Sequence, residues 1–280
     1  MRVHAVAARS GRDVARNLES AVAAVAAAAT DGVDLVVLPE YAAAFDAHGV
    51  GRELAEPLDG PFVEGLRRAA REGGVAVVAG TAVPAGERAA NVVVAVDASG
   101  ALAGTYRKVH MYDAFGHRES DLLVSGDPSA PPLVLPVGDL VAGVLTCYDL
   151  RFPEVARRLV DAGADVLLVP AAWAPGEHKV DHWETLLRAR AIESTCYVVG
   201  AAQQGPGVVG DCLVVAPDGV VLARASAPGT AAVADLSSAT VAAVREQNPS
   251  LANRRYDVVP RPATGPARDW TGPGGGLRRW

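Results

Sequence analysis

Residues 141–154 read VAGVLTCYDLRFPE and join a strand pattern to a helix pattern through one cysteine, Cys147. The mainly apolar run at 140–146 is typical of a buried strand. Pro153 and Glu154 begin a helical pattern, since proline is favoured at the first position of a helix. A thiol at such a junction is expected to be exposed near the positive end of a helix, which favours a nucleophilic thiolate. The alternative is a buried core cysteine, and this stretch alone leaves both open.

Strand and helix patterns alternate on either side of this junction. We predict strands at residues 3–8, 35–38, 75–81, 91–96, 102–106, 140–146, 165–169, 197–201, 208–215, 220–224 and 231–235, with Pro170 ending the strand at 165–169. Helices are predicted after an Asp13 cap, at 61–72, 153–162 and 181–195, and from a Ser237 cap to about 247. This order favours one α/β domain of layered sheets and outer helices over residues 1–258. Residues 259–280 are rich in Pro and Gly and are expected to form a tail.

Composition excludes several classes of function. The 280 residues carry a net charge of −6 without any basic run, so a nucleic-acid partner is not expected. The three cysteines are far apart and form no CxxC pair, which argues against a disulfide framework and favours a reducing compartment. The longest apolar runs are too short to span a bilayer, so we expect a soluble, cytoplasmic protein with no membrane partner.

Three polar residues of different chemistry follow predicted strands. Glu40 follows the strand at 35–38, Lys108 follows the strand at 102–106, and Cys147 follows the strand at 140–146. Lysine is rare here, because only Lys108 and Lys179 occur among 26 basic residues. Ligand sites of α/β sheets collect beyond the carboxyl ends of strands. A carboxylate, an ammonium and a thiol at such ends make a coherent set of base, oxyanion stabiliser and nucleophile.

The segments that carry these residues resemble the signature motifs of a known family. They are LPE at 38–40, YRKVH at 106–110 and LTCYDLRFPE at 145–154, with further similarity in HWE at 182–184, RARAIE at 188–193 and VREQ at 244–247. Together they resemble the nitrilase superfamily of carbon–nitrogen hydrolases, and most of all its omega-amidase and deaminated-glutathione-amidase branch. The resemblance covers about residues 1–258. It implies a four-layer α-β-β-α sandwich that forms a homodimer or higher homo-oligomer through its outer helices.

The resemblance also implies a role for each site residue. Cys147 matches the nucleophile, Glu40 the general base and Lys108 the cation that faces the tetrahedral intermediate. Glu119 matches a second glutamate that orients the lysine and the substrate, and the backbone N–H of Tyr148 would complete the oxyanion hole. These roles imply an amidase that forms a thioester and needs no metal or organic cofactor. Because a neighbouring ammonium lowers the pKa of a thiol, a thiolate is expected at Cys147.

The substrate is left open by the sequence. The first candidate is a small amide, and this class includes amides that bear a carboxylate. An N-carbamoyl hydrolase and, less favoured, a true nitrilase share the scaffold. A catalytically silent interaction module is also conceivable, although the complete set of Glu40, Lys108 and Cys147 argues against it.

For several further residues, a functional role is weighed against a structural one. His178 and His182 are spaced four apart as metal ligands can be, but no HExxH motif or clear third ligand accompanies them, so no metal site is predicted. Trp173 either walls the pocket or belongs to the core. Cys196 is expected to be structural. Cys212 is also expected to be structural, although the pair Asp211-Cys212 after Gly210 departs from the family pattern and leaves pocket details there open.

Arg151 lies four residues beyond Cys147, where related carbamoylases use arginine for a substrate carboxylate. The alternative is a structural salt bridge to Asp149 or Glu154. If Arg151 binds a carboxylate in two-pronged fashion, Arg151→Lys should raise KM for carboxylate-bearing amides far more than for neutral amides. Steady-state kinetics on both substrate classes tests this, and equal effects would leave only the structural role.

Overall fold

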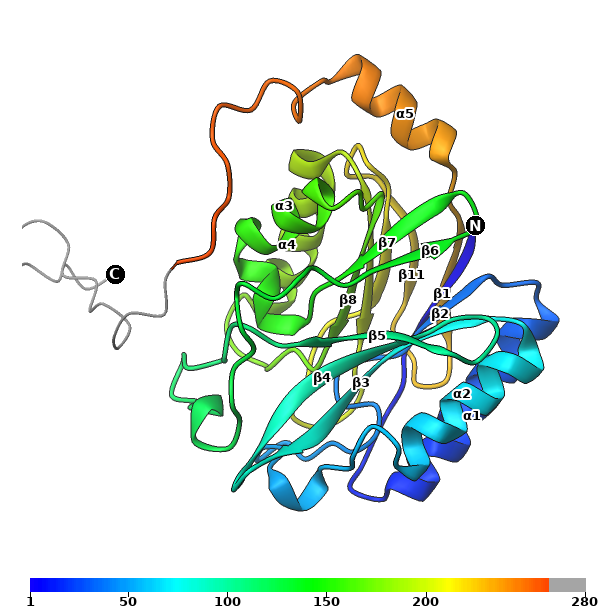
Figure 1. Cartoon of the computed structure of the whole chain (residues 1–280), viewed down its shortest axis with the longest axis vertical. Helices are drawn as coiled ribbons and strands as arrows, with labels where there is room; N and C mark the ends of the chain where they lie inside the picture. The colour runs from blue at the N-terminus through cyan, green and yellow to red at the C-terminus, as the bar shows by residue number, and fades with distance from the viewer. Residues whose placement is uncertain (262–280) are drawn as a thin grey trace, which may run out of the picture.

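The computed structural model describes residues 1–261, so most of the predicted tail at 259–280 lies outside the described residues. Within them the strands form two six-stranded sheets (Figure 1). The first has the order β12 (Ala231–Asp235), β1 (Arg2–Val6), β2 (Leu35–Val37), β3 (Ala76–Ala85), β4 (Arg88–Val96), β5 (Leu102–Arg107). The second has the order β11 (Val221–Ala225), β10 (Cys212–Val215), β9 (Tyr197–Ala202), β8 (Val166–Ala171), β7 (Leu140–Val144), β6 (Val134–Val137).

The sheets pack face to face, and helices cover their outer faces (Figure 1). Successive side chains of β2 point to opposite faces of its sheet. Leu35 and Val37 point to the second sheet, whereas Val36 packs with the helices α1 (Val14–Thr30) and α2 (Pro61–Gly73). The other outer face is covered by α3 (Pro153–Asp161) and α4 (Lys179–Ser194), while α5 (Ser238–Gln247) follows β12. The predicted four-layer α-β-β-α sandwich is therefore confirmed.

Most predicted elements are present, and the two predicted helix caps are confirmed. Asp13 accepts a hydrogen bond from the Arg16 N–H, and Ser237 accepts one from the Ala239 N–H. The strand β6 was not predicted, and β10 begins at Cys212 instead of at residue 208. None of the helices in residues 1–261 combines the length and apolar composition that crossing a bilayer requires.

The prediction that Pro170 ends its strand is wrong, because β8 continues to Ala171. The Pro170 carbonyl accepts a hydrogen bond from Thr146 Oγ1 at 2.8 Å, so this edge of Pro170 faces the β7 side. β7 has already ended at Val144, and no ladder bond there requires the missing proline N–H. The extra residues carry β8 to the edge where the polar residues gather.

Gly80 in β3 lets the chain segment that follows β2 lie unusually close to the β3 backbone. Its N–H donates to the Pro39 carbonyl at 3.0 Å. A Cβ atom at Gly80 would lie 2.4 Å from the Cα atom of Glu40 and 2.6 Å from the Tyr41 nitrogen. The position of Glu40 therefore depends on the absence of a side chain at residue 80.

We expect Gly80→Ala to lower the free energy of unfolding by about 1–3 kcal/mol, because the new methyl group must displace backbone atoms. Thermal unfolding measures the loss. Gly11→Ala is the matched control, because a Cβ there meets no atom within 4 Å and its φ is not positive. Equal stability of the two variants would contradict the close packing against Glu40.

Candidate active site

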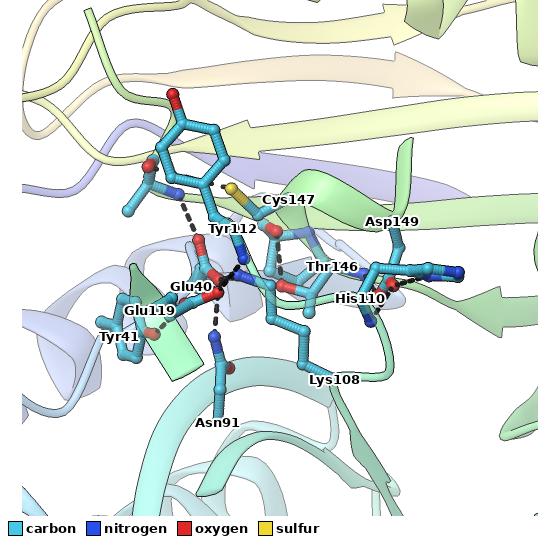
Figure 2. Close-up of polar contacts among 12 residues, drawn as sticks. Glu40, Tyr41, Asn91, Lys108, His110, Tyr112, Glu119, Thr146, Cys147 and Asp149 are labelled. Carbon is cyan, nitrogen blue, oxygen red and sulfur yellow. Dashed lines mark hydrogen bonds and ion pairs between the residues drawn. The ribbon is translucent and has the colours of Figure 1, made fainter. Parts of the chain in front are cut away.

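Strands from both sheets bring the predicted residues to one edge of the sandwich (Figure 2). Glu40 follows β2 and Lys108 follows β5 in the first sheet, whereas Cys147 follows β7 in the second. β2 pairs in parallel with β3, and β4 pairs antiparallel with both β3 and β5. The carboxyl ends of β2 and β5 therefore point in the same direction. Residues that are 39 to 107 positions apart in the chain thus meet through topology alone.

The Lys108 ammonium lies between two carboxylates. Its Nζ atom is 3.0 Å from Glu40 Oε1 and 2.8 Å from Glu119 Oε1, and Lys108 is only 1% exposed. Burial works to lower the pKa of Lys108, but the negative charges of Glu119 and Glu40 outweigh it and raise this pKa well above its usual value. Lys108 is therefore a permanent cation in this site.

Both carboxylate oxygens of Glu40 accept hydrogen bonds. Its Oε1 atom accepts from Asn91 Nδ2 at 2.6 Å as well as from Lys108, and its Oε2 atom accepts from the Ala172 N–H at 2.7 Å. Gln203 Nε2 donates to the Glu40 carbonyl at 3.1 Å. The carboxylate is therefore fixed by both sheets, because Ala172 follows β8.

Glu119 lies at the start of a 3₁₀ turn, Glu119–Asp121, and supports Lys108 from the opposite side. The Tyr41 hydroxyl donates to Glu119 Oε1 at 2.8 Å, and the Tyr112 N–H donates to Oε2 at 2.7 Å. Burial would raise the pKa of Glu119, but the Lys108 charge and hydrogen bond hold it below its usual range. Burial and then the Glu119 charge raise the pKa of Tyr41 well above its usual value, so Tyr41 stays a donor.

Cys147 departs from the expected exposed thiolate. The residue is buried, with 8% of its surface exposed, and its Sγ atom lies 3.8 Å from the Ala172 carbonyl oxygen. Burial and the negative charge of Glu40 raise the pKa of the thiol well above its usual value, and Lys108 opposes this only in part. The prediction of a lowered pKa is therefore wrong, because it counted the ammonium but neither the burial nor the carboxylate.

The turn that presents Cys147 is held by a buried network. Cys147 begins the 3₁₀ helix Cys147–Arg151 with a φ of 49°, a strained conformation that costs about 1–3 kcal/mol. Thr146 and Asp149 form a capping box across it. Asp149 also accepts hydrogen bonds from the Tyr106 hydroxyl at 2.8 Å and from the His110 N–H at 3.1 Å. The His110 contact at 3.1 Å is from its backbone N–H, and its ring atom Nδ1 also lies 2.7 Å from Asp149 Oδ1. These contacts hold the strained turn in place.

The backbone N–H of Tyr148 follows Cys147 directly in the chain and is free to donate a hydrogen bond. In residues 1–261 no backbone or side-chain acceptor takes it. A backbone donor at this place could bind the oxygen of a substrate carbonyl.

A small pocket opens at Cys147 and is lined by Tyr112, Cys147, Tyr148, Arg151, Trp173, Ala174 and Lys179. Arg151 Nη2 lies 3.3 Å from His182 Nδ1, and its Cζ atom lies 5.1 Å from the centre of the Trp173 ring. Within the described chain Arg151 makes no ion pair with Asp149 or Glu154. Both interpretations of Trp173 agree with the structure, because the side chain is buried in the core and also lines the pocket.

Several contributors to the site were not predicted. Asn91 could have been recognised from the sequence, because it is the one amide in the otherwise apolar predicted strand at 91–96. No feature of the sequence pointed to the Ala172 N–H or the Tyr41 hydroxyl. Cys196 and Cys212 are buried, and burial raises the pKa of each thiol to about 12. No group of three or more potential metal-ligating side chains gathers anywhere in residues 1–261.

Comparison with known proteins gives a consistent result. The family model described as "Carbon-nitrogen hydrolase" matches residues 2–246. A deaminated glutathione amidase of Escherichia coli O157:H7 is 39% identical over 244 residues, which are 86% of this chain and 92% of that protein.

Two solved structures are also similar. The Caenorhabditis elegans NitFhit protein has a TM-score of 0.82 at 29% identity, covering 92% of this chain and 66% of that one. A mutant amidase from Nesterenkonia sp. AN1, with acrylamide added to its active-site cysteine, has a TM-score of 0.72 at 28% identity and covers 90% and 97%.

The electrostatics of Cys147 predict a thiol that is protonated at neutral pH. Because its pKa lies above the usual value of about 8.5, the thiolate should be absent between pH 6 and 8 and appear only at higher pH. Thiolate absorbance at 240 nm, compared between the native protein and Cys147→Ala, measures this. A thiolate signal below pH 8 that Cys147→Ala removes, and that the control Cys196→Ala keeps, would contradict it.

Proposed function

The chain belongs to the carbon–nitrogen hydrolase family of the nitrilase superfamily, and we propose that it is a cysteine-dependent amidase that converts a small amide to a carboxylic acid and ammonia. One observation carries this proposal: the backbone of one residue, Ala172, contacts the proposed base through its N–H and the proposed nucleophile through its carbonyl. Its N–H donates to Glu40 at 2.7 Å, and its carbonyl oxygen lies 3.8 Å from Cys147 Sγ. Their shared contact with Ala172 supports the proposal that Glu40 and Cys147, which lines the pocket, act on the same substrate.

The first half of the proposed cycle makes a thioester. Cys147 Sγ attacks the amide carbon while Glu40 takes the thiol proton, so the sulfur needs no prior ionisation. The Lys108 ammonium and the Tyr148 N–H stabilise the oxygen that becomes negative. The C–N bond then breaks, and Glu40 gives its proton to the leaving nitrogen, which departs as ammonia.

The second half releases the acid. Glu40, again a carboxylate, takes a proton from a water molecule that attacks the thioester carbon. Lys108 and Tyr148 stabilise the second oxyanion in the same way. Breaking the C–S bond returns the proton from Glu40 to the sulfur. The products are a carboxylic acid and the starting enzyme.

Glu119 has a supporting role in this cycle. Its contact with Nζ at 2.8 Å keeps Lys108 charged and in place when Glu40 becomes protonated during each half-reaction. With Glu40 alone as partner, the buried ammonium would have no carboxylate partner whenever Glu40 is protonated.

The domain is proposed to span residues 1–258 and to form a homodimer or higher homo-oligomer through its outer helices. Val180 and Ile192 on α4 are 53% and 47% exposed, and Val220, just before β11, and Leu222, within β11, are also exposed. Apolar residues on one helix and a neighbouring strand suit a subunit contact. Light scattering on the purified protein gives the mass that tests this.

We expect Cys147→Ala and Cys147→Ser each to lower kcat by about 10³-fold or more while the fold remains intact, because the thioester can no longer form. Ammonia release measures turnover, and circular dichroism checks the fold. Cys196→Ala is the matched control, since it removes a buried thiol outside the pocket. Full activity in either Cys147 variant would remove this residue from its proposed role.

The same assay separates the alternative substrates. Amides, N-carbamoyl amino acids and nitriles are offered in parallel, with ammonia, carbon dioxide and acid measured. Amides should give ammonia and acid. Preferred release of carbon dioxide with ammonia from carbamoyl compounds, or direct conversion of nitriles, would replace the amidase proposal.

A further inference from the structure

The turn that carries the proposed base has a strained backbone. Glu40 is followed by Tyr41, whose φ of 57° lies in the left-handed region that favours glycine. A non-glycine residue stays in this conformation only where the surrounding structure holds it. Glu40 and Tyr41 are both buried, so the carbonyl groups of this turn need hydrogen-bond donors from within the protein. The donors that bind these carbonyl groups therefore contribute to the position of the Glu40 carboxylate.

One buried side chain, that of Gln203, binds the carbonyl groups on both sides of the strained φ angle. Its Nε2 atom lies 3.1 Å from the Glu40 carbonyl oxygen and 3.3 Å from the Tyr41 carbonyl oxygen, and the residue is only 1% exposed. The φ angle of Tyr41 is the dihedral angle that relates these two carbonyl carbon atoms. A single amide group that binds both oxygens therefore opposes the relaxation of Tyr41 to an unstrained conformation.

Gln203 is itself held in one orientation. It follows β9, and its backbone N–H donates to the Ala171 carbonyl, at the end of β8, at 2.8 Å. Its Oε1 atom accepts from the Ser10 N–H at 3.0 Å, and its Nε2 atom donates to Ser10 Oγ at 3.0 Å. A reversed amide would place Oε1 against carbonyl oxygens, which cannot donate a hydrogen bond. Gln203 therefore ties the turn after β2 to the strand ends of the second sheet.

The neighbouring strand of the second sheet binds the side chain of the same glutamate. The Ala172 N–H donates to Glu40 Oε2 at 2.7 Å, so the end of β8 holds the carboxylate and the end of β9 holds the main chain. The Ala172 carbonyl oxygen also lies 3.8 Å from Cys147 Sγ. A shift of the Glu40 main chain away from Gln203 would move the carboxylate relative to this sulfur. A misplacement of about 1 Å can cost about 100-fold in rate.

We infer that Gln203 is a positioning residue of the reaction, which holds the Glu40 carboxylate where it can take the proton of Cys147. This inference rests on the proposed amidase function. Among the described residues that line the pocket at Cys147, Gln203 is absent, so it acts through the main chain of Glu40 and Tyr41. Its loss should therefore slow proton transfer and leave substrate binding unchanged.

The kinetic test replaces Gln203 by methionine, which has a similar length but no donor. We expect Gln203→Met to lower kcat for an amide by about 10- to 100-fold and to change KM by less than about 2-fold, because only the transition state is affected. Gln204→Met is the matched control and should keep the native kcat. Gln204 Nε2 also donates to two carbonyl oxygens, those of Ala202 and Gly210 at 3.2 and 3.0 Å, but neither belongs to the turn of Glu40. An unchanged kcat in Gln203→Met, or an equal fall in both variants, would overturn the inference.

A second test does not depend on turnover. Alkylation of Cys147 by iodoacetamide, followed by mass spectrometry of the peptide that contains it, also requires removal of the thiol proton. Gln203→Met should slow this alkylation about 10-fold or more. In a Glu40→Gln background the same change should have no further effect, because it acts through the base. Equal slowing with and without Glu40 would show that Gln203 does not act through this carboxylate.

These outcomes separate the inference from the proposed function. If Gln203→Met slows alkylation only when Glu40 is present but the native protein hydrolyses no amide, the positioning role stands and the amidase proposal fails. If the native protein and Gln203→Met hydrolyse amides with the same kcat, the amidase proposal stands and the positioning role is overturned.

Thermal unfolding verifies that each variant is folded. If Gln203→Met is not, Ser10→Ala decides, because it removes one hydrogen bond from the same amide. In this variant kcat should fall about 5-fold, as expected for the loss of one hydrogen bond. A folded Ser10→Ala variant with the native kcat would contradict the positioning role.

Discussion

The structure depends on one buried ammonium, that of Lys108, held between the carboxylates of Glu40 and Glu119. A charge inside a sandwich of two apolar sheets is tolerated only when it is paired, and removing one partner of such a pair typically costs about 3–5 kcal/mol. The pairing joins the end of β2 to the end of β5, and the hydrogen bond from Ala172 to Glu40 adds the end of β8 from the other sheet. The same contacts that satisfy the charge therefore assemble the site.

These charges also determine how the thiol can react. Glu40 and the apolar surroundings keep Cys147 protonated, and Lys108 does not reverse this. A site of this kind gains nothing from a resting thiolate, because Glu40 can take the proton while the carbon–sulfur bond forms. The strained backbone of Cys147 is held by the Thr146–Asp149 capping box, which fixes the position of this residue at the turn after β7. In the proposed mechanism, electrostatics and backbone geometry both favour attack of the sulfur on a carbonyl carbon within the pocket.

Sequence patterns predict the part of this arrangement that depends on strand ends. Glu40 and Cys147 follow apolar runs and Lys108 follows a predicted strand, and the rule that strand ends gather at one edge is sufficient to bring them together. The burial of Cys147 could not be predicted, because it depends on residues 25 to 32 positions away, such as Ala172 and Lys179. Pro170 misled the strand assignment, since a strand can accommodate proline where its neighbour has ended. The rarity of lysine singled out Lys179, but only the fold shows which surface it faces.

The most direct measurement is the mass of the enzyme quenched in acid during turnover of a small amide, followed by peptide mapping. If Glu40, Lys108 and Cys147 act on the same carbonyl, the acyl group of the substrate must appear as a thioester on the peptide that contains Cys147. Its mass should exceed that of the free peptide by the acyl group less one hydrogen. Steady turnover with no acyl group on this peptide, or with the acyl group on another residue, would contradict the convergence of these three side chains on one reacting carbon.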